Sequence, residues 1–324
     1  MLTPALFLLA GFGLLIVGGE LLVRGAVRLA EKAGMSQLLI GLTIVGFGTS
    51  APELVASVGA ALTGYPNIAW GNVVGSNLAN SLLILGIASL IYPMAVPRGP
   101  LWRDGGLALV ATIVLGIAAM LNIVGAALGS IFLFVLVAYL IFAYREEKTA
   151  GPVHSAVAEK AEALEVADPA LHLEQSALRS VMILSAGIVS IVLGGSWLVS
   201  GAVEIATWAG LSEATIGLTV IAIGTSMPEL VTAVIAARKG ASAVALGNVL
   251  GSNLFNLLLI GGSTAIIAPA AIAPSIVLFS LPVLIAVSIL TLLFAATSHR
   301  ISRVEGGILL AIYIALTTYS LMAP

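Results

Sequence analysis

Hydrophobic residues fill long stretches of this chain, and short polar or glycine-containing connections separate them. Runs of about twenty apolar residues have the length that an α-helix needs to cross the hydrocarbon core of a bilayer. The pattern therefore predicts an all-α integral membrane protein with ten transmembrane helices. The predicted spans are residues 3–22, 37–63, 67–93, 101–121, 124–144, 180–200, 213–237, 241–268, 273–297 and 304–322.

One polar segment, residues 145–179, interrupts this pattern. It holds eleven charged residues, whereas the whole chain has 13 Lys and Arg and 15 Asp and Glu. Such a composition is typical of a solvated linker. We expect this segment to bind no ligand and to contain at most a short amphipathic helix around residues 155–167. It divides the chain into residues 1–144 and 180–324, with five predicted spans each.

The two halves are copies of one another. A shift of 176 residues aligns residues 41–91 with residues 217–267 without a gap, and 28 of these 51 positions are identical. Because each half has an odd number of spans, the second copy must enter the membrane in the opposite orientation. Two inverted five-helix repeats are the plan of many secondary transporters, whose substrate sites lie near the bilayer midplane between the halves.

The composition excludes several classes of protein. Charged residues make up 9% of the chain, against about 25% in an average soluble domain. The chain has no Cys, and its three His lie in or beside polar segments, which excludes disulfides and Cys- or His-ligated metal sites inside the membrane. The absence of a large basic patch argues against a nucleic-acid partner. Apart from the lipid bilayer, no cofactor or obligate protein partner is predicted.

The basic residues indicate the orientation in the membrane. With the N-terminus outside, the ten-span arrangement places every Lys and Arg on the cytoplasmic side, as the positive-inside rule requires. Both termini are then outside, in a multi-pass protein of the plasma membrane. The thirteen basic residues are Arg24, Arg28, Lys32, Arg98, Arg103, Arg145, Lys148, Lys160, Arg179, Arg238, Lys239, Arg300 and Arg303.

Two carboxylates, Glu53 and Glu229, lie deep within predicted spans and are repeat mates. A charge in the bilayer interior costs several kcal/mol unless it is paired or faces an aqueous cavity. No span core supplies a Lys, Arg or His as a partner, so we expect a cation from outside the chain. The alternative is a protonated Glu that is hydrogen-bonded in a helix interface.

Each glutamate belongs to a Gly-Thr-Ser-x-Pro-Glu-Leu motif, at residues 48–54 and 224–230. A proline within a helix removes one hydrogen bond and frees a carbonyl, so we expect each helix to be broken just before its Glu. The turn would then offer carbonyl, hydroxyl and carboxylate oxygens, which suit hard cations. The hydroxyls belong to Thr49, Ser50, Thr225 and Ser226.

A second duplicated motif, Gly-Asn-x-x-Gly-Ser-Asn, follows in the next span of each half. Side chains four residues apart lie on one helix face, so this motif forms a polar stripe in each half. Hydrogen bonding between helices is one role for such a stripe, and facing an ion is the other. Both roles can coexist, and we expect the outer members to tie helices together while Ser76, Asn80, Ser252 and Asn256 face the ions. The stripes are Asn72, Ser76 and Asn80, and Asn248, Ser252 and Asn256.

The two duplicated motifs together resemble the alpha repeats of the Ca2+/cation antiporter superfamily, specifically the prokaryotic sodium/calcium exchangers. The resemblance covers essentially the whole chain. It implies ten helices and a diamond of ion sites between the second, third, seventh and eighth of them, past which the first and sixth helices slide to alternate access. It also implies that Ca2+ binds Glu53 and Glu229 with the carbonyls of Thr49 and Thr225.

For Na+, the resemblance implies a ring of neutral oxygens, with Asn80 beside the centre. The implied ligands are Thr49, Ser50, Ser76, Thr225, Ser226, Ser252 and the carbonyl of Ala222. Where some relatives carry an acid in the second repeat, this chain has Asn256. The centre then has a formal charge of −2, which one Ca2+ neutralises, and potassium co-transport is not expected.

The predicted function is a secondary active antiporter that exchanges Ca2+ for Na+ by alternating access. The resemblance implies three Na+ per Ca2+, hence an electrogenic cycle. Two alternatives remain open. One is a proton-coupled Ca2+ antiporter, whose motif usually reads G-N-A-x-E. The other is an intramembrane hydrolase that uses the two glutamates as acid and base; the ring of hydroxyls and amides does not favour an enzyme.

Overall fold

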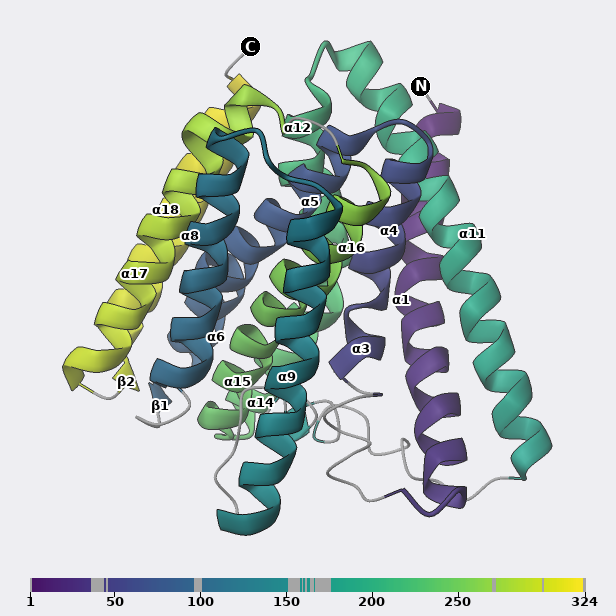
Figure 1. Ribbon diagram of the computed structural model, residues 1–324, viewed down its shortest axis with the longest axis vertical. Coiled ribbons are helices and arrows are strands. Elements are labelled where there is room, and N and C mark those ends of the chain that lie inside the picture. The colour runs from purple at the N-terminus through teal and green to yellow at the C-terminus, as the bar shows by residue number, and fades with distance from the viewer. Residues whose placement is uncertain are drawn as a thin grey trace.

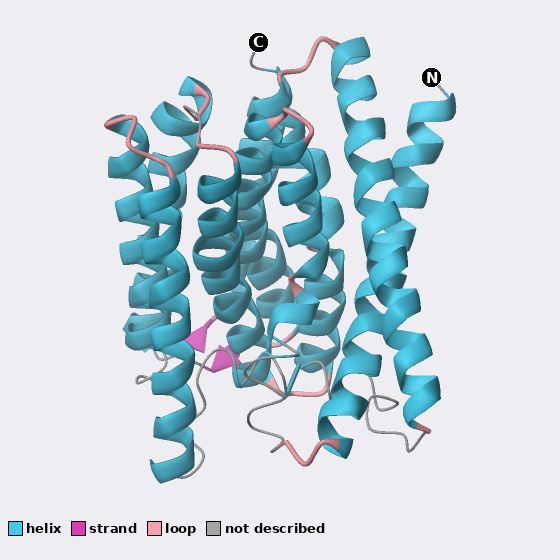
Figure 2. Cartoon of the chain, turned by 45° about the vertical axis from the view of Figure 1, so that its right-hand side comes forward, coloured by secondary structure: helices cyan, strands magenta, loops and turns pink. Residues whose placement is uncertain are grey.

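The chain folds into a bundle of helices, with one pair of very short strands (Figures 1 and 2). The computed structural model describes residues 2–35, 44, 46–95, 101–150, 158, 160, 162, 163, 166, 176–269, 272–298 and 300–322. Eight helices in this part of the chain are long and apolar enough to cross a membrane, and a bent pair makes up to nine. The two chain ends lie at the same end of the molecule (Figure 1). The all-α membrane class is therefore confirmed.

In the first half, several spans are made of consecutive helical segments, including π-helical ones labelled η. The elements are α1 (Leu2–Lys32), α3 (Gly46–Thr49), α4 (Ala51–Leu62), α5 (Pro66–Leu78), η2 (Ala79–Ile84), α6 (Leu85–Ile91), η3 (Leu101–Gly105), α8 (Gly106–Met120) and α9 (Ala126–Ala150).

The second half repeats this order of segments. Its elements are α11 (Ala177–Ala209), α12 (Glu213–Ile216), η4 (Gly217–Ile221), α13 (Ala222–Thr225), α14 (Met227–Arg238), α15 (Ser242–Leu254), η5 (Phe255–Gly261), α16 (Gly262–Ile267), η6 (Ile276–Ser280), α17 (Leu281–Ser298) and α18 (Arg303–Met322). Strands β1 (Met94–Ala95) and β2 (Arg300–Ile301) pair antiparallel and join the two halves.

Helices α1 and α11 lie side by side along one flank of the bundle (Figures 1 and 2). Glycines let their backbones approach closely, since a Cβ at Gly25 would lie 2.6 Å from the backbone nitrogen of Leu184. A glycine that permits such close approach recurs every seventh residue in both helices. The glycines at this interface are Gly11, Gly18, Gly25, Gly187, Gly194 and Gly201.

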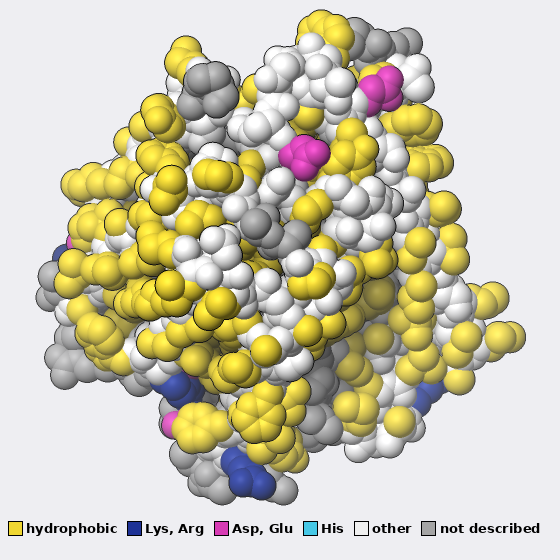
Figure 3. Space-filling model, turned by 45° about the horizontal axis from the view of Figure 1, so that its top comes forward, with side chains coloured by type: hydrophobic (Ala, Val, Ile, Leu, Met, Phe, Trp, Pro, Cys, Tyr) yellow, Lys and Arg dark blue, Asp and Glu magenta, His cyan; other side chains and the backbone are white. Residues whose placement is uncertain are grey.

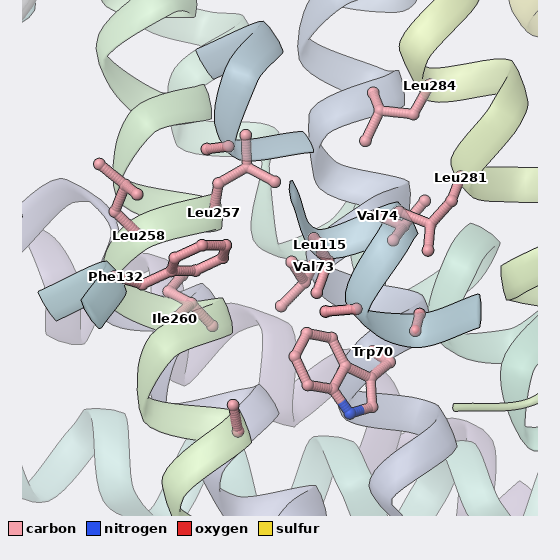
Figure 4. Close-up of a cluster of buried hydrophobic side chains, with 14 of the residues drawn as sticks. Trp70, Val73, Val74, Leu115, Phe132, Leu257, Leu258, Ile260, Leu281 and Leu284 are labelled. Carbon is pink, nitrogen blue, oxygen red and sulfur yellow. The ribbon is translucent and has the colours of Figure 1, made fainter. Parts of the chain in front are cut away.

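The interior of the bundle is packed with aliphatic side chains. Trp70 of α5 is fully buried and lies among residues from both halves, such as Phe132 of α9 and Leu257 of η5 (Figure 4). The outer faces of α8, α9, α11 and α18 instead expose large apolar residues, among them Phe134 and Val304 at 73% each. Hydrophobic side chains cover most of the surface in Figure 3. A lipid environment explains this pattern, because water would oppose it.

The helices differ from the predicted spans at their ends. The helix predicted at residues 3–22 continues to Lys32, and the one predicted at 180–200 covers Ala177–Ala209. Hydropathy marks the thickness of the membrane and not the end of a helix. Arg24 and Glu20, for example, form an ion pair one turn apart that extends α1 beyond its apolar part. The second predicted span lies partly outside the described residues.

The prediction that residues 145–179 form a solvated linker is wrong in part. Helix α9 runs on to Ala150, and α11 begins at Ala177. Five described residues between them are helical: Ala158, Lys160, Glu162, Ala163 and Val166. Lys160 and Ala163 are fully buried, while Glu162 is exposed. A helical stretch with one buried face therefore docks on the bundle, within the range where a short amphipathic helix was predicted.

Candidate functional site

Two helix breaks define the centre of the bundle. Ser50 separates α3 from α4, and Ser226 separates α13 from α14, with nearly the same backbone angles (φ −92°, ψ 7° and φ −85°, ψ 7°). The segments around Ser226 are bent by 47°. Each motif proline then lies in the first turn of the new helix, where its missing N–H is not needed. The predicted breaks are confirmed, three residues before each Glu.

Both glutamates lie in the first turn of the helix that follows a break. Each is only 2% exposed. The unpaired N–H groups at a helix N-terminus favour negative charge there. Each break therefore creates a helix N-terminus that stabilises the buried carboxylate.

Hydroxyl groups from the motifs contact the two carboxylates. Ser226 Oγ donates to Glu53 Oε1 at 3.2 Å, which links the second motif to the first. Ser252 Oγ donates to Glu229 Oε1 at 3.5 Å. Ser76, the repeat mate of Ser252, donates instead to Asn72 Oδ1 at 3.2 Å. The structure therefore brings Glu53, Glu229 and both duplicated motifs into one buried cluster.

The outer asparagines of the two stripes tie helices together. Asn72 Nδ2 donates to the Glu53 carbonyl at 3.3 Å and to Ser57 Oγ at 2.9 Å. Asn248 Nδ2 donates to the Glu229 carbonyl at 3.1 Å. Asn72 Oδ1 also accepts from Thr225 Oγ1 at 3.2 Å. For these two asparagines the interhelical role therefore holds.

The inner side chains carry polar atoms with no hydrogen-bond partner among the described residues. These atoms are Glu53 Oε2, Glu229 Oε2, Asn80 Oδ1, Asn256 Oδ1 and Asn256 Nδ2. Burying such atoms without a partner costs several kcal/mol each, and most buried polar groups are paired. Four of the five are oxygens, and they come in repeat-related pairs. The arrangement can supply oxygen ligands to a cation.

The remaining predicted ligands line the same breaks. Thr225 Oγ1 lies 3.0 Å from the Ile221 carbonyl and 3.5 Å from the Ala222 carbonyl. The Ala222 carbonyl also accepts from the Ser226 N–H at 3.1 Å. Thr49 ends α3 and is half-buried next to Ser50. Asn80 and Asn256 lie in π-helical segments, a distortion that is frequent at functional sites.

Lys160, which the sequence assigns to the linker, lies inside this cluster. Its Nζ donates to Ser50 Oγ at 2.8 Å and lies 3.8 Å from Glu229 Oε1 and 5.3 Å from the centroid of the Phe255 ring. Burial lowers the pKa of the Lys160 ammonium group, and the charges of Glu229 and Glu53 oppose that shift. The sequence excludes basic partners only within the span cores, and Lys160 reaches Glu229 from the segment between the two halves.

Comparisons with known proteins agree on one family. The family model described as sodium/calcium exchanger protein matches residues 3–145 and 179–322. The chain is 34% identical to the sodium/calcium exchanger MaX1 of Methanosarcina acetivorans, covering 96% of each chain, and 36% identical to the putative antiporter CaxA of Alkalimonas amylolytica, covering 97% of each. A structure of the sodium-calcium exchanger NCX_Mj soaked with Na+ and Sr2+ matches with a TM-score of 0.63, 29% identity and 98% of each chain covered.

Proposed function

This chain belongs to the sodium/calcium exchanger family, and on that premise we propose that it is a secondary active antiporter that exchanges Ca2+ for Na+ across the plasma membrane. The observation that carries the proposal is a set of four buried oxygens, on Glu53, Glu229, Asn80 and Asn256, that have no hydrogen-bond partner in the part of the chain that the structure describes. They come from α4, η2, α14 and η5, and α4 contacts η5 while α14 contacts η2. The surrounding apolar helices have the length of membrane spans.

The charge of the centre fits a divalent cation. Two glutamates give a formal charge of −2, which one Ca2+ or two Na+ balance. The neutral oxygens around them offer places for further monovalent ions, which two protons alone would not need. The proposed ligands are Glu53, Glu229, Thr49, Thr225, Ser50, Ser226, Ser76, Ser252, Asn80, Asn256 and the carbonyl of Ala222.

Alternating access requires two states that expose the centre to opposite sides, and an inverted repeat supplies them by symmetry. We propose ten spans in two inverted repeats, residues 1–144 and 180–324, with both termini outside. Two observations support this. Helices α4 and α14 both have 12 residues, and α5 and α15 both have 13, at the 176-residue shift. The segments α3 to α4 and α12 to α14 run in opposite directions in Figure 1.

The proposed role is transport and not catalysis. An intramembrane hydrolase needs an acid and a base that reach a substrate bond and a water molecule. Here the hydroxyls of Ser226 and Ser252 are bonded to the carboxylates themselves. Four of the five site atoms without a hydrogen-bond partner among the described residues are oxygens in repeat-related pairs. A cluster in which oxygens predominate suits a cation better than a scissile bond.

Ion uptake by liposomes tests the proposal. Purified protein in Na+-loaded liposomes should accumulate radiolabelled Ca2+ when the liposomes are diluted into Na+-free buffer. Liposomes loaded with K+ are the matched control and should not accumulate it. Absence of Na+-dependent uptake would reject the proposal. If an acid-inside pH gradient without Na+ drives Ca2+ uptake at the same rate as the Na+ gradient, the protein is instead a proton-coupled Ca2+ antiporter.

A further inference from the structure

Lys160 brings a positive charge of the chain itself into the proposed ion site. Its side chain is 0% exposed although it belongs to the polar segment between the two halves. The ammonium group contacts two of the proposed ligands, Ser50 Oγ at 2.8 Å and Glu229 Oε1 at 3.8 Å. It also lies over the ring of Phe255, the neighbour of Asn256 in η5.

The stretch that carries Lys160 is held on both sides. Ala158 packs against the core cluster around Trp70, and Ala163 belongs to the separate cluster that contains Ala233 and Ala237 of α14. Farther along, the Val166 carbonyl accepts from Lys239 Nζ at 2.9 Å. Lys160 therefore reaches the centre from a docked segment.

The ammonium group and a transported cation exclude each other. Two cations on the same carboxylate group, one at Glu229 Oε1 and the other at Oε2, repel strongly in a site from which water is excluded. The two glutamates carry −2 in total, so Ca2+ and Lys160 together would leave an uncompensated positive charge. Ser50 Oγ, moreover, directs a lone pair at Lys160 that a metal ion would need.

The segment lies at the end of the bundle where α14 finishes at Arg238 and Lys239, which is the cytoplasmic side in the proposed orientation. We propose that Lys160 is a tethered cation that occupies the ion site from the cytoplasmic side and competes there with the transported ions. The inference rests on the proposed exchange function. A short tether gives the ammonium group an effective concentration in the millimolar range, so cytoplasmic ions must exceed a threshold before they displace it.

Equilibrium binding of Ca2+ to the full-length protein in Na+-free detergent micelles tests this competition. We expect Lys160→Gln to bind Ca2+ about tenfold more tightly than the wild type, since the competitor is lost. Lys239→Met should also bind Ca2+ more tightly than the wild type, but by a smaller factor than Lys160→Gln. The reason is that the segment carrying Lys160 loses the hydrogen bond from Lys239 to the Val166 carbonyl. Glu162→Gln, on the exposed face of the same stretch, is the matched control and should match the wild type.

Labelling of lysines by an acetylating reagent, read by mass spectrometry, gives a readout that does not depend on affinity. Lys160 should react much more slowly than the exposed Lys239 without Ca2+ and faster once Ca2+ saturates the site. Equal Ca2+ affinities of the wild type and Lys160→Gln, or labelling of Lys160 as fast as Lys239 without Ca2+, would overturn the competition while leaving the ion site standing. No Ca2+ binding in any of the proteins, the wild type included, would reject the ion site and the inference with it.

Discussion

Asn80 and Asn253 bond to each other across the two halves: Asn80 Nδ2 donates to Asn253 Oδ1 at 3.1 Å. Asn253 Nδ2 in turn donates to Ser81 Oγ at 3.0 Å. These bonds fix the Asn80 amide so that its Oδ1, which has no partner among the described residues, stays available. The repeat mate of Asn253 does not do this, because Asn77 Nδ2 donates to the carbonyl of Val73 in its own helix, at 2.7 Å. The two repeats therefore have the same asparagines but different side-chain hydrogen bonds.

This asymmetry predicts unequal effects of two equivalent substitutions. Asn253→Ala frees the Asn80 amide to rotate, and we expect Ca2+ affinity to fall about tenfold, since one buried hydrogen bond to a positioned ligand is worth about 1 kcal/mol or somewhat more. Asn77→Ala leaves Asn80 held and should change affinity less than about twofold. Calcium titration of both variants compares them directly, and equal losses would contradict the positioning role of Asn253.

The glutamates should be indispensable for Ca2+ transport. Glu53→Gln and Glu229→Gln each leave a centre with one negative charge, which is too weak to replace the water shell of a divalent cation. We expect Na+-dependent Ca2+ uptake to fall at least about a hundredfold in each variant while the protein still elutes as a folded species. Glu20→Gln is the control, because that carboxylate pairs with Arg24 near the surface and should keep its uptake. Substantial uptake in either site variant would refute the assignment.

The sequence predicted those features of the site that arise within a single helix, and it missed individual contacts between distant segments. Pro52 and Pro228 act on their own helices, so the breaks at Ser50 and Ser226 followed from the motif alone. The interhelical role of the outer asparagines, Asn72 and Asn248, was predicted from the stripes. The bond between Asn80 and Asn253 was not, because it depends on which neighbouring helix each amide meets. Lys160 was missed for a similar reason. Its segment has the charge of a linker, and only contacts of Ala158 and Ala163 with distant helices reveal that it docks.

The contact between α1 and α11 should depend on its glycines. A Cβ at Gly18 would lie 2.8 Å from the backbone nitrogen of Ile191, so Gly18→Leu must push the helices apart at a cost of about 1–3 kcal/mol. We expect a lower thermal unfolding midpoint. Gly13→Leu is the matched control in the same helix, because that position is exposed and a Cβ there meets nothing within 4 Å. An equal loss of stability in the two variants would contradict the close contact.

The orientation in the membrane can be tested with single cysteines, since the native chain has none. Leu121→Cys, on the connection between α8 and α9, should react with an impermeant thiol reagent added outside. The neighbouring Asn122 is less suitable because its backbone is left-handed (φ 54°). Lys239→Cys should react only from the inside. The reverse labelling pattern would overturn the orientation inferred from the thirteen basic residues.

The last prediction concerns the electrical balance of the cycle. If three Na+ exchange for one Ca2+, as the family resemblance implies, one uncompensated positive charge crosses the membrane per cycle. The proposed site offers enough oxygens for this, because the hydroxyls of Ser226 and Ser252 contact the two carboxylates and Ser50 and Ser76 supply two more hydroxyls from the same motifs. Moving one charge through 100 mV is worth about 2.3 kcal/mol, so a membrane potential must change the rate of exchange.

The sign of the effect follows from the direction of the ions. When Na+-loaded liposomes take up Ca2+, three positive charges leave the lumen for every two that enter, so net positive charge moves out. An inside-positive potential should therefore accelerate Ca2+ uptake, and an inside-negative potential should slow it. Potentials set with valinomycin and K+ gradients of either direction, at a constant Na+ gradient, measure this. Uptake that is the same at both potentials would mean that two Na+ exchange for each Ca2+, which the two glutamates alone could balance.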